Sequence, residues 1–327
     1  MSEKLNYGTA ILSAFHYLLD KYPEVFVIGQ GLWSPWYVGS TMTNLEKDYG
    51  KHRVIDTPVS ESACTGAAVG AALSGMRPIV VHPRMDFMLY AMDSIVNQAA
   101  KWSSMTGGQS SVPVTVRAII NRGGEQGAQH SQALHSWFAH VPGLRVVMPA
   151  SVADARDLFI ASVLSDDPVM FIDDRWLYEQ EDTLDPIQEI SLSKQAPIVL
   201  KQGTDLTIVA SGYSTLLALK SAEILEAQNY SIEVIDQRII NPVSIENTLN
   251  SVSKTKNLLV IDSGTKTGSF SAEIIANVIE NISINLLDSL PKRITLPDAP
   301  APTSRVLESN YYFTEEDITL FVKKLLS

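Results

Sequence analysis

The chain has 327 residues and a formal net charge of −11, and 45% of its residues are hydrophobic against 19% charged. This length allows two domains of ordinary size, and the composition excludes an intrinsically disordered chain. Because the chain is acidic and contains no basic run, we expect neither a nucleic-acid partner nor attachment to a membrane surface.

The single cysteine, Cys64, excludes a framework of intrachain disulfides and favours a reducing compartment. We expect it to be a packed thiol. The N-terminal stretch has no basic flank leading into a long apolar run, so the sequence predicts neither a secretion signal nor a membrane span. A cytoplasmic location is therefore expected.

The chain begins with an alternation of helix and strand. Apolar spacing predicts an amphipathic helix over 11–19, followed by a strand at 25–28 that ends at Gly29. The loop at 30–37 follows that strand, at the position where open parallel sheets bind ligands. A second short strand ends at Ile55.

The next helix is built from unusually small residues. The Thr57-Pro58 pair breaks the preceding strand, and Ser60 is a candidate N-cap. Alanine and glycine then dominate as far as Gly75, so another backbone or helix can approach closely. We expect this helix to form an interface.

Glu61, at the start of this helix, is the leading candidate for a catalytic residue. An acidic residue in a first helical turn is favoured by the helix dipole and need do nothing else. The residues that follow Glu61 are small or apolar, however, which favours a carboxylate facing a buried seam. A buried carboxylate requires a partner.

The remaining pattern predicts an α/β protein with two doubly wound domains. Further strands are expected at 78–81, 113–120, 145–148, 168–172, 205–210, 232–235 and 257–261, most followed by a helical pattern. The period is lost after about 173, as expected for a linker. We therefore divide the chain into a first domain at 1–180, a linker at 181–202 and a second domain at 203–327.

A glycine-rich loop after the 113–120 strand contains the string Gly-Ala-Gln-His-Ser-Gln at 127–132. Its glycine spacing matches neither a dinucleotide fingerprint nor a phosphate-binding loop. His130 is a second candidate, because histidine can donate to a carboxylate and changes charge near neutral pH. Alternatively, His130 caps the helix that we expect near Ala133. His135 is expected at the surface.

These strings resemble one family. The Thr-Pro-x-Ser-Glu sequence ending at Glu61, the 93–101 segment and the string around His130 are similar to the beta subunit of heterotetrameric, thiamine diphosphate-dependent 2-oxo acid dehydrogenases, which act on pyruvate, branched-chain substrates and acetoin. The resemblance implies a pyrimidine-binding transketolase-like domain and a transketolase C-terminal-like domain. It also implies decarboxylation of a 2-oxo acid and transfer of the acyl group to a lipoyl carrier.

The resemblance assigns roles to four residues. Glu61 would bond the aminopyrimidine ring nitrogen of thiamine diphosphate, and Phe87 would lie beside that ring. Tyr90 would line the pocket and influence substrate choice. His130 would contact the substrate carboxylate or the reaction intermediate. The chain departs from the family at 30–31, where Gln-Gly replaces residues that are usually acidic and are linked to communication between active sites.

The family's Gly-Asp-Gly stretch and later asparagine, which hold a divalent metal and the diphosphate, are absent from this sequence. The resemblance therefore implies that Mg²⁺ is held mainly by an alpha subunit in an α2β2 heterotetramer, and we predict no metal ligand in this chain. Some relatives also bind K⁺ through backbone carbonyls, which leave no trace in sequence. A lipoyl acyltransferase is a further candidate partner.

Two alternatives stay open at this stage. A split transketolase or an acyloin-forming enzyme uses the same cofactor to transfer a ketol or aldehyde unit. A paralogue that only supports assembly would carry no chemistry. The altered residues at 30–31 and at Tyr90 favour these alternatives, whereas intact Glu61 and His130 argue against a silent chain.

Overall fold

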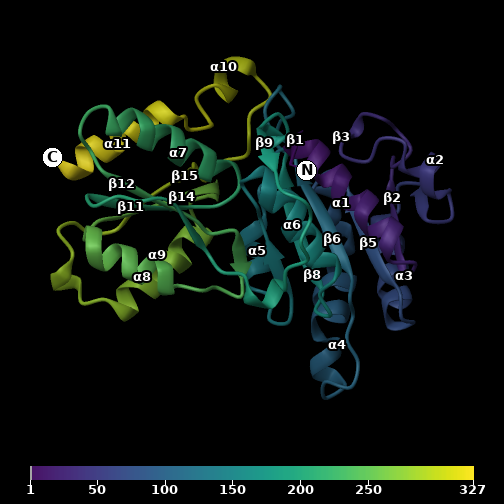
Figure 1. Ribbon diagram of the computed structural model, residues 1–327. Coiled ribbons are helices and arrows are strands. Elements are labelled where there is room, and N and C mark those ends of the chain that lie inside the picture. Colours follow the sequence, from purple (N-terminus) through teal and green to yellow (C-terminus); the bar gives the residue numbers. More distant parts are fainter. Residues whose placement is uncertain (1) are drawn as a thin grey trace.

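The computed structural model describes residues 2–327 and shows two α/β domains side by side (Figure 1). The predicted fold class is confirmed, because each domain has a mainly parallel sheet covered by helices. The elements of the first domain, where η1 and η3 are 3₁₀ helices and η2 is a π-helix, are β1 (Glu3–Asn6), α1 (Tyr7–Lys21), β2 (Val25–Gln30), β3 (Tyr37–Ser40), α2 (Leu45–Tyr49), β4 (Val54–Thr57), α3 (Glu61–Leu73), β5 (Arg77–His82), η1 (Phe87–Ala91), η2 (Asp93–Ala99), α4 (Ala100–Met105), β6 (Thr115–Ile120), α5 (His135–Ala139), β7 (Arg145–Val147), α6 (Val152–Val163), β8 (Val169–Asp174) and η3 (Arg175–Leu177).

The rest of the chain forms the connection and the second domain. Its elements, with η4 and η5 as 3₁₀ helices, are β9 (Glu181–Leu184), η4 (Leu192–Lys194), β10 (Ile198–Lys201), β11 (Leu206–Ala210), α7 (Tyr213–Glu226), β12 (Ile232–Asp236), β13 (Ile239–Asn241), α8 (Glu246–Thr255), β14 (Leu258–Thr265), α9 (Phe270–Asn281), η5 (Ile284–Leu286), β15 (Lys292–Leu296), α10 (Arg305–Glu308) and α11 (Glu315–Leu326).

The first sheet has the strand order β13-β7-β8-β6-β5-β2-β4, in which all neighbours are parallel except the antiparallel pair of β13 and β7. The second sheet has the order β10-β12-β11-β14-β15, with β10 antiparallel. Because β4, β2 and β5 are parallel neighbours, their carboxyl ends meet at one edge of the first sheet. That edge positions the candidate site.

Alternate residues of β5 enter two different cores. Val80 packs into a core with α3, whereas Ile79 and Val81 pack into a core with α1. A parallel sheet that is buried on both faces requires apolar residues on both sides of its strands. The core on the Val80 side continues into the second domain through residues such as Phe270, so the two domains share apolar packing.

The helix predicted around 91–97 is divided in the structure. The chain passes from the 3₁₀ helix η1 through the π-helix η2 into α4. Single-turn widening of this kind occurs often at functional sites. Here η1 begins with Phe87, one of the predicted cofactor-binding residues.

The segment at 181–202, predicted to be a linker, contains two edge strands. The first, β9, pairs with β1 at the start of the chain, and the second, β10, pairs with β12 of the second sheet. Three of the four residues of β9 are exposed, which explains why no periodic apolar pattern marks it. The division into 1–180, 181–202 and 203–327 stays a prediction, since β13 of the second half joins the first sheet.

His135 corrects the sequence analysis. We expected it at the surface, but it is fully buried at the start of α5, and its Nε2 atom lies 2.9 Å from Oδ1 of Asp262 on β14. The sequence pattern around His135 gives no sign of this pair, because its partner lies 127 residues away in sequence. The pair joins the two domains.

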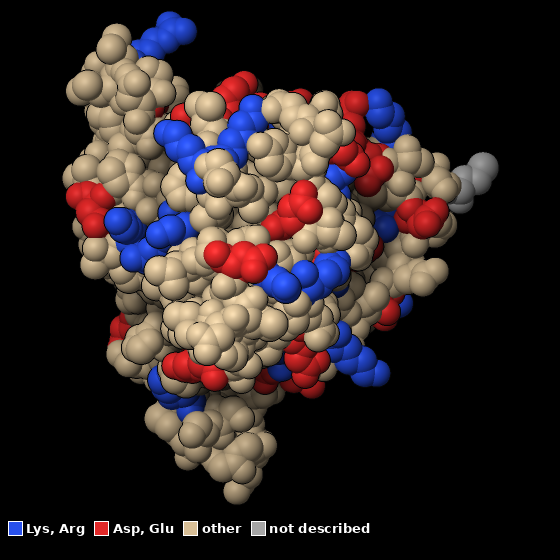
Figure 2. Space-filling view, turned by 90° about the vertical axis from the view of Figure 1, so that its left-hand side faces the viewer, with Lys and Arg blue, Asp and Glu red and all other residues tan. Residues whose placement is uncertain are grey.

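The face of the molecule shown in Figure 2 has no large patch of a single charge. On the face shown in Figure 2, basic and acidic side chains are interspersed, and most of the surface is neutral. Within residues 2–327, none of the helices has both the length and the apolar character needed to span a bilayer.

Candidate active site

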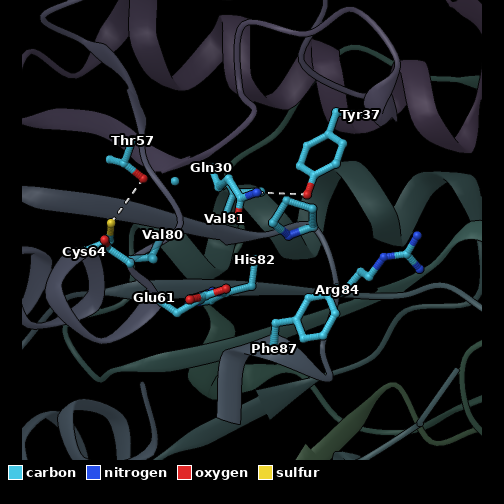
Figure 3. A pocket seen from close by; sticks show the side chains of 13 residues that line it. Gln30, Tyr37, Thr57, Glu61, Cys64, Val80, Val81, His82, Arg84 and Phe87 are labelled. Carbon is cyan, nitrogen blue, oxygen red and sulfur yellow. Dashed lines mark hydrogen bonds between the residues drawn. The ribbon is translucent and has the colours of Figure 1, made fainter. Parts of the chain in front are cut away.

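A small pocket opens where three neighbouring parallel strands end. Gln30, Thr57 and His82, the last residues of β2, β4 and β5, all line it. Its full lining is Gly29, Gln30, Tyr37, Thr57, Ser60, Glu61, Cys64, Val80, Val81, His82, Pro83, Arg84 and Phe87 (Figure 3). The carboxyl edge of a parallel sheet is where α/β proteins bind their ligands.

Glu61 is the first residue of α3, and its half-buried side chain reaches into this pocket. The positive end of the helix dipole favours a carboxylate there. Within residues 2–327 the Glu61 carboxylate makes no hydrogen bond or ion pair, while its backbone carbonyl accepts from Thr65 at 2.8 Å. The carboxylate is therefore free to bind a ligand.

Ser60 is the N-cap residue of α3, as predicted, but its hydroxyl does not cap the helix. The hydroxyl instead donates to the carbonyl of Val59 at 2.7 Å. Because Ser60 does not cap the helix, the first N–H groups of α3 receive no side-chain cap from it.

The small-residue helix has one buried and one open face. Cys64 is 8% exposed and its Sγ donates to Oγ1 of Thr57 at 3.2 Å, so the predicted packed thiol is confirmed. Exposed residues on the other face are Ser62, Ala63, Gly66, Ala67 and Gly70. This open strip agrees with the expectation that another backbone approaches closely, and that expectation stays a prediction.

His82 forms a buried part of the pocket that sequence reasoning did not select. It is 3% exposed, and its Nε2 lies 3.2 Å from Oγ1 of Thr65 on α3. Burial lowers the pKa of His82 to about 4, so the imidazole is neutral at neutral pH. Only its position at a strand end, just before a proline, could have drawn attention to it.

The unusual Gln30-Gly31 pair accommodates a tyrosine. Gln30 Nε2 donates to the hydroxyl of Tyr37 at 3.2 Å, and the N–H of Gly31 donates to Oδ1 of Asp56 at 2.6 Å. Gly31 has a φ of +71°, and a Cβ atom at that position would lie 2.1 Å from Cδ1 of Tyr37. An acidic side chain cannot occupy position 31 beneath this ring, so Tyr37 and Gly31 depend on each other.

Phe87 and His130 lie against each other. Their ring centroids are 5.2 Å apart at an interplanar angle of 85°, an edge-to-face contact. Phe87 lines the pocket, and His130 lies behind it in the loop between β6 and α5. The N-cap residue of α5 is Leu134, so His130 is not the cap of that helix.

Tyr90 lies outside the pocket lining. It is 77% exposed on η1, three residues after Phe87. Its predicted contact with a cofactor has no counterpart within this chain and stays a prediction, as do the roles of Glu61, Phe87 and His130. Glu61 and Phe87 line one pocket, His130 contacts Phe87 without lining it, and Tyr90 lies at the surface.

Among residues 2–327, no cluster of three or more His, Cys, Asp and Glu side chains is arranged to hold a metal ion. The pocket offers one free carboxylate, a neutral imidazole and an aromatic wall. These groups suit a flat heteroaromatic ring with a hydrogen-bonding edge better than a divalent cation, which prefers several oxygen ligands.

Comparison with known proteins identifies the family. Residues 3–180 match the transketolase pyrimidine binding domain, and residues 195–318 match the transketolase C-terminal domain. The chain is 34% identical over 319 residues to the mitochondrial pyruvate dehydrogenase E1 component subunit beta of Bos taurus, covering 94% of this chain and 87% of that protein. It is 36% identical over 282 residues to the acetoin:2,6-dichlorophenolindophenol oxidoreductase subunit beta of Bacillus subtilis, covering 86% and 82% of the two chains.

A solved structure described as a split gene transketolase, inactive beta4 tetramer, superposes with a TM-score of 0.78 at 21% identity and covers 98% of each chain. At that identity the likeness shows the fold alone. The two matched domains span most of the chain, and the curated relatives share about a third of its residues over most of both lengths. This chain belongs to the transketolase-like family of thiamine diphosphate-dependent 2-oxo acid dehydrogenase beta subunits.

Proposed function

We propose that this chain acts with an alpha subunit to decarboxylate a 2-oxo acid, and that its pocket binds the aminopyrimidine of thiamine diphosphate. One observation carries the proposal. The partner-free carboxylate of Glu61 faces a pocket that has the aromatic ring of Phe87 on another wall. This arrangement fits a flat aminopyrimidine, with Glu61 at a ring nitrogen and Phe87 against the ring.

When bound, thiamine diphosphate supplies the carbon nucleophile that takes up the 2-oxo carbon. Glu61 holds a proton against the ring nitrogen of the aminopyrimidine, which makes the neighbouring amino group a better base. Phe87 fixes the plane of the ring. His82, neutral because burial lowers its pKa to about 4, completes the pocket wall without adding a charge.

His130 serves the substrate in this proposal. It is not part of the pocket lining, and its ring meets the phenyl ring of Phe87 edge-on. From this position it donates a hydrogen bond to the carboxylate of the 2-oxo acid. Tyr90 is exposed on η1 and contacts substrate only once the partner subunit covers it.

The alpha subunit supplies Mg²⁺ and the diphosphate contacts, and a lipoyl acyltransferase accepts the acyl group. Support comes from the lack of a metal cluster in the described residues and from the open small-residue face of α3, on which a second chain can pack. We propose an α2β2 assembly, with K⁺ as a further structural ion. The lone cysteine supports a cytoplasmic location, although the bovine relative is named as mitochondrial.

Glu61→Gln tests the proposal in the complex reconstituted with an alpha subunit. We expect exchange of the thiazolium C2 proton of bound cofactor, followed by NMR, to slow about a hundredfold or more, because the acid at the ring nitrogen is lost. Glu46→Gln is the matched control, since Glu46 is also a half-buried acid in a first helical turn. Equal exchange rates in the two variants would show that Glu61 is only a charge at a helix end.

A second measurement tests the need for a partner. Calorimetry of the purified chain with Mg²⁺ and thiamine diphosphate should show no micromolar binding, because residues 2–327 contain no cluster of metal ligands and the family's Gly-Asp-Gly stretch is absent from the sequence. Adding the alpha subunit should restore it. Tight binding to the chain alone would contradict the shared site.

A further inference from the structure

Two arginines border the pocket without a carboxylate partner. Arg84 follows β5 and lines the pocket, and Arg175 follows β8. The Nη2 atom of Arg175 donates to the backbone carbonyl of Tyr37, whose side chain lines the same pocket. The two guanidinium groups are therefore neighbours at the carboxyl edge of the first sheet.

Each of the two arginines has a buried nitrogen without an acceptor. Within residues 2–327 these atoms are Nη1 of Arg84 and Nε of Arg175. A buried donor on a cation is destabilising when it stays unpaired, and two adjacent cations repel each other. Burial and, after it, the charge of Arg175 lower the pKa of the Arg84 guanidinium, which nevertheless stays protonated at neutral pH.

The other arginines on neighbouring strands are neutralised. Arg117 pairs with Asp173 at 2.6 Å, and Arg122 pairs with Asp174. The acidic residue near Arg84 is Asp86, which forms no ion pair with it. Oδ1 of Asp86 instead accepts from the backbone and side-chain amides of Gln132. Of Arg84, Arg117, Arg122 and Arg175, only Arg84 and Arg175 form no ion pair within residues 2–327.

We propose that Arg84 and Arg175 bind an oxyanion, a carboxylate or phosphate group, that the substrate carries in addition to its 2-oxo acid group. Arginine matches such groups because its planar fork donates two parallel hydrogen bonds. In Figure 3 Arg84 extends on the opposite side of the pocket from Glu61, with Phe87 between them. A substrate can therefore react near Phe87 while its remote anionic end reaches the two arginines.

The assignment of this anion to the substrate rests on the proposed function, whereas binding of an anion at the pair does not. Anion binding is therefore measured without turnover. Calorimetry at constant ionic strength uses inorganic phosphate and glutarate, with the full chain alone and with the chain assembled with its alpha subunit in the absence of cofactor. The two probes distinguish a phosphate ester from a carboxylate as the natural group.

We expect saturable binding of one probe, weakened about tenfold or more in Arg84→Gln and in Arg175→Gln, because each loses a charged donor. Arg305→Gln is the control, since Arg305 is exposed on α10 and also lacks an ion pair. The melting temperature of Arg84→Gln without ligand should be unchanged or higher, because an unpaired cation has been removed, whereas Arg175→Gln also loses the hydrogen bond to the carbonyl of Tyr37. A structural role for Arg84 would lower the melting temperature of its variant.

Three outcomes would overturn the proposal that Arg84 and Arg175 bind an anion. The first is no saturable binding to the chain or to the assembly. The second is equal affinity in Arg84→Gln and Arg305→Gln. The third is binding to the chain that disappears on assembly, which would show that a carboxylate of the alpha subunit occupies the pair. In each case the exchange test on Glu61 still decides the proposed function independently.

Discussion

The imidazole of His135 and the carboxylate of Asp262 form a buried pair between the two domains, with Nε2 and Oδ1 2.9 Å apart. Asp262 also accepts hydrogen bonds from the backbone N–H groups of Gly264 and Ser271. Burial would raise the pKa of Asp262, but His135 and these two N–H groups outweigh it and hold that pKa below its ordinary value. Asp262 is therefore an ionised group that fixes α5 against β14.

We expect His135→Ala to lower the free energy of unfolding by about 3 kcal/mol, because it leaves a buried carboxylate without its side-chain partner. Denaturant unfolding followed by circular dichroism measures the loss. His140→Ala, at the exposed C-terminal end of the same helix, is the control and should change stability little. A similar loss of stability in both variants would mean that any substitution in α5 destabilises the chain, and that the pair of His135 and Asp262 contributes nothing to the free energy of unfolding.

We predict that the buried imidazole of His82 makes the stability of the chain depend on pH. Its pKa is lowered by burial from 6.5 to about 4, so the unfolded chain binds a proton at a higher pH than the folded chain does. Stability is therefore complete above about pH 6.5 and declines as the pH falls toward 4, by about 3 kcal/mol from this residue alone. Unfolding free energies at several pH values in this window measure the decline.

The control for His82 removes the titrating group and keeps an aromatic side chain. His82→Phe should show a shallower fall in stability between pH 6.5 and 4 than the natural chain, because other groups still titrate. The difference between the two curves isolates His82. Identical slopes would show that burial does not hold this imidazole neutral.

Much of the fold could be read from the sequence because its signals are local. Strands such as β2 and β5 contain short apolar runs, and the Thr57-Pro58 break placed the start of α3 correctly at Glu61. The edge strand β9 was missed because most of its residues are exposed and its strand partner, β1, lies at the other end of the first domain in sequence. Pairing between distant segments leaves no periodic signal in either one.

The site shows the same division between local and distant signals. Glu61 and His130 lie in strings that could be recognised, and in the structure Phe87 lines the pocket beside Glu61 and contacts His130. The unpaired state of Arg84 could not be predicted, because it depends on which distant carboxylates are occupied elsewhere. Likewise, His135 looked exposed until the fold brought Asp262 to it.

Gly31 offers a test of the altered loop. Its φ of +71° lies in the left-handed region, and a Cβ atom there would overlap the ring of Tyr37. Gly31→Ala should therefore destabilise the chain by about 1–3 kcal/mol, the sum of backbone strain and steric overlap. Thermal and denaturant unfolding measure the effect.

Gly124→Ala is the matched control for Gly31, because Gly124 has a φ of +62° but open space where a Cβ atom would lie. It measures the backbone strain alone. The excess loss in Gly31→Ala should disappear when Tyr37→Ala is added, since the overlapping ring is then gone. If Gly31→Ala costs as much stability in the Tyr37→Ala background as in the natural chain, the ring does not determine the choice of glycine.

His130→Ala separates a substrate contact from a structural one. His130 lies in a loop and meets Phe87 edge-on, so its removal costs the fold one aromatic contact of about 0.5–1.5 kcal/mol. If His130 positions the substrate carboxylate, turnover should fall about a hundredfold or more, while cofactor binding to the assembled complex changes little. Turnover with an artificial electron acceptor, calorimetry and melting are measured on the same complex.

His52→Ala is the control, because His52 is an exposed histidine outside the pocket lining, and it should leave all three measurements unchanged. Normal turnover with a lower melting temperature would make His130 a support for Phe87 and leave Glu61 as the catalytic residue of this chain.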